Sequence, residues 1–142
     1  MKKIILIMIS VLLLIGCGKS DESKEYKVKD LHDNDVKVVV NTEDKIDLLI
    51  EDSGKYVTKD NEKIASIVFA SKDNYEQFAN NLLDKTNVIK KDNDYVFYST
   101  DNNYNHLFLI KDMETAVIIT SDKKENSEIA FNHLTFSKYP VE

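Results

Sequence analysis

Short apolar runs separated by turn-forming residues fill most of the chain from Val36 onward. Runs rich in β-branched and aromatic side chains are typical of strands, and the Asp, Asn, Ser and Gly residues between them favour tight turns. The pattern also indicates a last short extended segment around Phe136. The predicted strands span residues 36–40, 46–50, 55–58, 64–69, 88–90, 95–99, 106–110 and 115–120.

Two segments show the 3.6-residue spacing of an amphipathic helix instead. In the first, residues 73–85, Asp73 and Glu76 have the spacing of an N-terminal capping box. Its apolar face consists of Tyr75, Phe78, Ala79, Leu82 and Leu83. The second helix, about residues 123–133, directs Ile129, Ala130 and Leu134 toward the core.

This order of elements predicts an α+β fold, with an antiparallel β-meander sheet and both helices packed on one of its faces. An offset of 51 residues aligns the strand and helix of the two halves, and it pairs Ala65 with Ala116 and Phe78 with Ile129. The alignment is compatible with two ββββα repeats that arose by duplication. The alternative is that any two strand–helix segments share such a pattern.

The beginning of the chain has a different pattern. Lys2 and Lys3 precede an uncharged apolar run over residues 4–15, which is broken only by Ser10. In a helix this run spans about 18 Å, too little for the roughly 30 Å hydrocarbon core of a bilayer. It is therefore predicted to be the apolar region of an export signal rather than a transmembrane helix.

The apolar run ends in Leu14, Ile15, Gly16 and Cys17, which resemble the lipobox of bacterial lipoprotein precursors. The resemblance implies that Cys17 receives a diacylglyceryl group and that signal peptidase II removes residues 1–16. Membrane lipid would then be a partner through acylated Cys17, and the protein would lie on the extracytoplasmic side of the cell membrane. The alternative is an ordinary secretory signal followed by a chance cysteine.

Residues 17–31 are predicted to be the lipidated cysteine and a flexible tether, since residues 18–30 are polar with little to bury. Residues 32–142 are predicted to form one α+β domain, which is long enough to hold a core without disulfides. Cys17 is the only cysteine of the chain.

The charge balance argues against some partners. The net charge is −6, and removal of Lys2 and Lys3 with the leader changes it to about −8, so nucleic acid is not expected to bind. All 19 basic residues are lysine, which with the abundant Asn and Ile suggests an AT-rich, Gram-positive source. The absence of arginine also removes the usual bidentate clamp for phosphates.

Candidate chemistry in the domain is sparse. His32, His106 and His133 are isolated along the sequence, so neither a metal site nor a cofactor is expected from them. Asp/Asn clusters at residues 33–35, 92–94 and 101–103 offer oxygen ligands suited to Ca²⁺. Because Asp and Asn are also the residues that tight turns prefer, a turn role is favoured over calcium binding.

Aromatic residues crowd the second half of the meander. Alternation in the strand at residues 95–99 places Tyr95 and Phe97 on one face and Val96 and Tyr98 on the other. An exposed Tyr98 would favour a partner-binding patch. The favoured alternative is that cross-strand pairs shield the sheet.

Together these features predict a non-enzymatic lipoprotein that binds or shields a protein partner at the cell surface. A small exported enzyme and a calcium-binding module are the alternatives within the domain. A third alternative concerns the leader, whose residues 10–16 resemble the hydrophobic peptide pheromones released from Gram-positive lipoprotein leaders.

Overall fold

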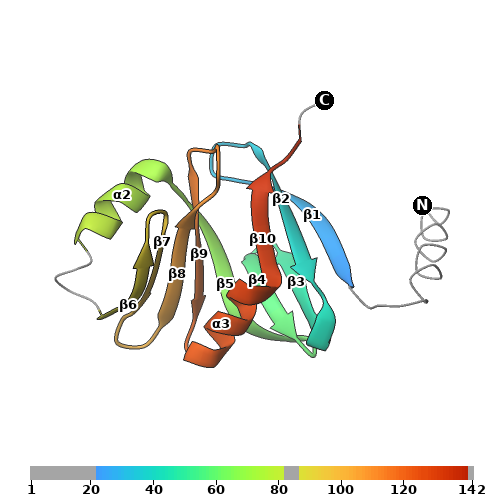
Figure 1. Ribbon diagram of the computed structural model, residues 1–142. Helices are drawn as coiled ribbons and strands as arrows, with labels where there is room; N and C mark the ends of the chain where they lie inside the picture. Colours follow the sequence, from blue (N-terminus) through green and yellow to red (C-terminus); the bar gives the residue numbers. More distant parts are fainter. Residues whose placement is uncertain (1–21, 82–86, 141–142) are drawn as a thin grey trace.

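The computed structural model describes residues 22–81 and 87–140. The predicted signal peptide, the lipobox and Cys17 lie outside these residues, as do Leu82 and Leu83. The described chain forms two antiparallel sheets and two α-helices (Figure 1). The α+β class and the antiparallel meander predicted from the sequence are thereby confirmed.

The smaller sheet has the strand order β1-β2-β10, formed by β1 (Ser23–Lys29), β2 (Asp35–Asn41) and β10 (Leu134–Lys138). The larger sheet has the order β3-β4-β5-β9-β8-β7-β6. Its strands are β3 (Ile46–Glu51), β4 (Gly54–Lys59), β5 (Glu62–Ser71), β6 (Asn87–Asp92), β7 (Tyr95–Ser99), β8 (Tyr104–Leu109) and β9 (Thr115–Ser121). The helices are η1 (Glu43–Lys45), α2 (Lys72–Asn81) and α3 (Lys124–His133).

The main core lies between the two sheets and beneath α3. Alternation along β2 buries Val36, Val38 and Val40 almost completely. They share one cluster with Val117 and Ile119 of β9 and with Ala130 of α3. In Figure 1 α3 and β10, in orange and red, cover the same side of the large sheet. One face of the large sheet is therefore covered by a second sheet and a helix.

A second core lies beneath α2. Tyr75 and Ala79 of this helix pack against Leu107 of β8 and Ala116 of β9. Because neighbouring strand residues point to opposite faces, Ala116 and Val117 cannot face the same helix. The two helices thus lie on opposite faces of the large sheet, and the expectation of a single face is wrong.

The strand order of the large sheet is symmetric about its centre, but the helices do not follow this symmetry. Each half adds its strands outward from the central β5–β9 pair, as two repeats would. The two-fold axis that exchanges two antiparallel strands is perpendicular to the sheet, so it keeps each face of the sheet on the same side. Two repeats related by this axis would therefore have both helices on one face, whereas the helices lie on opposite faces. The 51-residue offset also aligns Val68, 55% exposed, with fully buried Ile119. The helices therefore do not support the ββββα repeat.

Strand β1 lies within the predicted tether, so that part of the boundary at residue 31 is wrong. All seven β1 residues pair with β2, from Ser23 with Asn41 to Lys29 with Asp35. Only Val28 is buried and Tyr26 half-buried, because β1 is an edge strand with one face on the core. Such a strand has too few apolar residues to stand out in a charged segment.

Candidate functional site

A cleft of about 1070 Å³ lies between α2 and two turns of the large sheet. We call it the α2 cleft. One wall is an α2 face with helical spacing, formed by Lys72, Tyr75, Glu76, Ala79 and Asn80. The other walls are Lys91, Asn93 and Asp94 around the β6–β7 turn, and residues 109–114 between β8 and β9. The sequence analysis assigned these Asp and Asn residues to turns and did not predict the cleft.

Backbone hydrogen bonds hold the walls of the α2 cleft in place. The Lys72 amide donates to the Glu114 carbonyl at 3.0 Å, which fixes the start of α2 to the β8–β9 connection. The Leu109 amide donates to the Asp94 carbonyl at 3.0 Å, which joins the two turns. At the helix start, the Asn74 amide donates to Ser71 Oγ at 3.0 Å. Ser71 thus supplies the cap that was predicted for Asp73 and Glu76.

Charges of both signs line the α2 cleft. Its lysines are Lys72, Lys91 and Lys111, and its carboxylates are Glu76, Asp94, Asp112 and Glu114. Within residues 22–81 and 87–140, none of these seven side chains forms an ion pair. Among the described residues, these charges have no ion-pair partner within the protein.

Tyr75 forms part of the floor of the α2 cleft. It is 5% exposed, and its buried hydroxyl has no hydrogen-bond partner in the described part of the chain. Burial and the nearby Asp94 carboxylate both raise the pKa of Tyr75, so the phenol stays protonated and able to donate. A buried donor without an acceptor destabilises the protein, and such groups are rare in folded proteins.

A smaller cleft of about 460 Å³ adjoins the first and shares Asp112, Met113 and Glu114 with it. Asp30 supports this region. One Asp30 oxygen accepts from the His32 and Asn34 amides, both at 2.8 Å, and the other accepts from Thr115 Oγ1 at 2.6 Å. Burial alone would raise the pKa of Asp30, but these hydrogen bonds hold it below its usual value.

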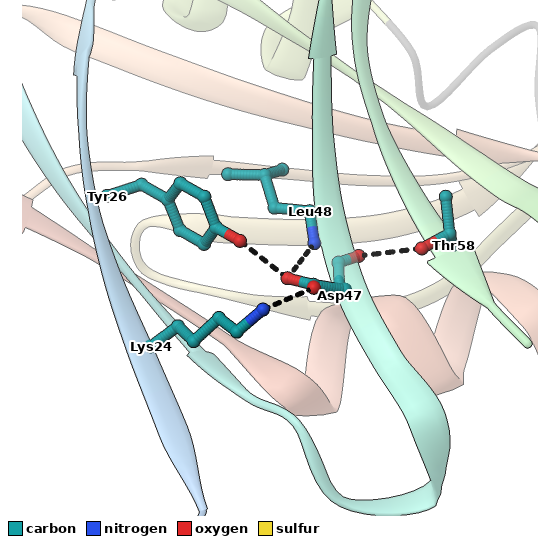
Figure 2. Close-up of polar contacts among 5 residues, drawn as sticks. All are labelled: Lys24, Tyr26, Asp47, Leu48 and Thr58. Carbon is teal, nitrogen blue, oxygen red and sulfur yellow. Dashed lines mark hydrogen bonds and ion pairs between the residues drawn. The ribbon is translucent and has the colours of Figure 1, made fainter. Parts of the chain in front are cut away.

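A second polar cluster joins β1 to the large sheet (Figure 2). Asp47 accepts from Tyr26 at 2.6 Å, from the Leu48 amide at 2.7 Å and from Lys24 Nζ at 2.8 Å. Burial together with the Asp47 hydrogen bond raises the pKa of Tyr26. Every polar group at Asp47 is thus paired within the protein, so we assign this cluster to the attachment of β1.

The three histidines lie apart. His106 is buried between Phe97 and Phe131, His32 is exposed in the β1–β2 turn, and His133 ends α3. The Asp/Asn clusters of the sequence lie in or beside turns, with Asp33 in the left-handed conformation at a φ of 68°. In the described ranges, no three acidic, histidine or cysteine side chains are close enough together to hold a metal ion.

The aromatic residues of the second half are shielded rather than exposed. Tyr98 is 3% exposed, and Phe78 of α2 packs edge-on against it with ring centroids 5.6 Å apart. Burial raises the pKa of Tyr98 to about 12. An exposed Tyr98 patch is therefore not present.

No family model, no curated protein and no solved structure matches the chain. Among the described residues, no helix combines the length and apolar character needed to cross a membrane.

Proposed function

We propose that this protein is a lipoprotein, anchored by lipid on Cys17, that acts outside the cytoplasm without catalysis and binds a partner at the end of the domain farthest from the membrane. The lipobox-like residues 14–17 support the anchor. The position of the α2 cleft relative to β1 supports the binding role, and it is the observation that carries the proposal.

Strand β1 begins only six residues after Cys17. Six residues span at most about 22 Å when fully extended, so the beginning of β1 stays near the lipid. The strand then runs away from this point, and the turn that follows it contacts Thr115 beside the α2 cleft. In Figure 1 β1 begins at the lower right of the molecule and runs upward, and the β8–β9 connection lies at the upper end. The α2 cleft therefore opens at the end opposite the proposed anchor.

The anchor is tested by Cys17→Ser in the full chain, expressed in a Gram-positive host with labelled palmitate. We expect wild-type protein to carry label and to fractionate with membranes. The serine variant should lose the label and accumulate unprocessed or in the medium, because serine has no thiol to receive the diacylglyceryl group. Ser20→Ala, three residues beyond, is the control and should behave as wild type. A serine variant that is processed and membrane-bound like wild type contradicts the proposal.

A further inference from the structure

We propose that the α2 cleft binds a short polypeptide segment that carries both ammonium and carboxylate groups. This inference rests on the proposed binding role and adds the chemical class of the partner. It follows from the charges, the dimensions and the floor of the cleft.

The charges of the α2 cleft exclude strongly charged ligands of one sign. Three lysines and four carboxylates line it without pairing to one another in the described chain. A polyanion would meet the carboxylates and a polycation the lysines, and like charges in contact weaken binding. A segment with both signs can place each charge opposite its complement. Lysine ammonium groups suit this role, since they pair with carboxylates as point charges without a fixed fork geometry.

The dimensions favour an extended ligand. The helix wall reaches from Lys72 to Asn80, which at 1.5 Å per residue is about 12 Å. That length matches three to four residues of extended peptide at about 3.3 Å each. The volume of about 1070 Å³ is slightly above the roughly 300–1,000 Å³ range of small-molecule sites. A peptide therefore fits the cleft better than a compact metabolite.

The floor adds an apolar surface and one donor. Ala79 and Ile110 are buried beneath the charged rims. Tyr75 lies beside them, near Asp94, and its hydroxyl has no hydrogen-bond partner among the described residues. A peptide carbonyl placed at this hydroxyl would supply an acceptor for it. Peptide recognition combines such backbone contacts with side-chain contacts that select the sequence.

The test compares two double variants of the full chain in detergent. Lys72→Gln with Asp94→Asn removes one charge of each sign from facing walls of the α2 cleft, so the net charge is unchanged. Lys45→Gln with Asp60→Asn makes the same change in an exposed ion pair at the opposite end of the domain. Melting temperatures verify that both variants are folded.

A phage-displayed library of random heptapeptides is the probe. We expect wild type to enrich peptides that carry both acidic and basic residues. A synthetic copy of the most enriched peptide should bind the cleft variant at least tenfold more weakly than wild type, and the control variant within twofold of wild type. No enrichment, enrichment of peptides with one sign of charge, or equal binding to the cleft variant would overturn the inference. Palmitate labelling of the same wild-type preparation is read separately, so failure of the anchor is distinguishable from failure of the cleft.

Discussion

His106 shows what one buried polar residue does in this core. Its ring lies between Phe97 and Phe131, with centroid distances of 4.0 and 4.5 Å and nearly parallel planes. Nδ1 shares a hydrogen bond of 2.8 Å with the Tyr95 hydroxyl, and Nε2 has no partner in the described chain. Burial lowers the pKa of His106 to about 4, because a charged imidazolium would lose its hydration here.

The lowered pKa of His106 predicts a loss of stability in mild acid. The unfolded chain takes up a proton near pH 6.5, whereas the folded chain does so only near pH 4. The stability that depends on a neutral His106 is therefore complete above pH 6.5 and is lost as pH falls toward 4. At about 1.4 kcal/mol per pKa unit, the free energy of unfolding falls by roughly 3 kcal/mol over this range. Chemical denaturation at half-unit steps of pH measures this slope.

His106→Phe is the matched variant, since a phenyl ring keeps the stack and does not titrate. Its free energy of unfolding should change much less between pH 6.5 and 4 than that of wild type. Asp30, Asp35 and Asp47 also have lowered pKa values, and their contributions begin to fall as pH approaches their ordinary value of 3.8. Both proteins contain these carboxylates, so the difference between the two slopes reports His106. Equal slopes for the two proteins would show that His106 is not the titrating group.

The sequence could not reveal this role of His106. Strand alternation places it on the same face as Phe97 and Phe108, but a histidine at the start of a predicted strand is equally compatible with solvent. Its burial depends on Phe131 of α3, which is distant in the sequence and reaches the ring only in the folded protein. The α2 cleft escaped prediction for the same reason, because three separate segments form its walls.

At the scale of elements, α2 is only partly buried. The spacing of residues 73–85 predicted a fully buried stripe, and Tyr75 and Ala79 are indeed buried. Phe78, however, is 39% exposed, and its ring lies edge-to-face with that of Tyr98. A short helix across a twisted sheet directs only part of its apolar stripe into the core, and periodicity alone does not reveal which part.

Phe78→Ala is therefore expected to destabilise the domain by about 1–2 kcal/mol, less than the 3–5 kcal/mol typical of a fully buried aromatic residue. Asn80→Ala, at an exposed position of the same helix, should stay within about 0.5 kcal/mol of wild type. Urea unfolding of the full chain and its variants in detergent measures both changes. A loss above 3 kcal/mol for Phe78→Ala would mean that the side chain is buried more deeply than the structure has it.

The elements that the sequence predicts best are those whose own hydrophobic pattern is clear without knowledge of the neighbouring strands or helices. Residues 95–99 form β7 with the predicted bounds, and the second helix differs from prediction by one residue at its start. Turns with Asp and Asn mark the ends of β7, and the change from strand to helix spacing of apolar residues marks the start of the second helix. β1 has no such pattern, and Ser23–Lys29 is recognisable as a strand only by its pairing with β2.

At the scale of the whole molecule, the interval between Cys17 and β1 limits how the domain can stand on a membrane. Asn132 of α3 lines the same surface hollow as Glu22 and Ser23, so it belongs to the end near the anchor. Lys111 lies beside the α2 cleft, beyond the far end of β1. Seven residues of strand at about 3.3 Å each separate the two ends by about 20 Å. The acidic domain is also repelled by anionic headgroups, which disfavours lying flat.

This arrangement predicts unequal distances of the two ends from lipid. Asn132→Cys and Lys111→Cys, each made in the full lipidated chain, can be labelled selectively, because the one natural cysteine is occupied by lipid in the proposed anchor. In nanodiscs with nitroxide-labelled headgroups, a fluorophore at residue 132 should be quenched severalfold more than one at residue 111. Cys17→Ser added to each variant removes the lipid anchor and leaves the engineered cysteine as the labelled site. This change should abolish quenching at both positions. Equal quenching in the lipidated protein would mean that both ends lie at similar distances from the bilayer, and it would contradict an α2 cleft held at the end of the domain farthest from the membrane.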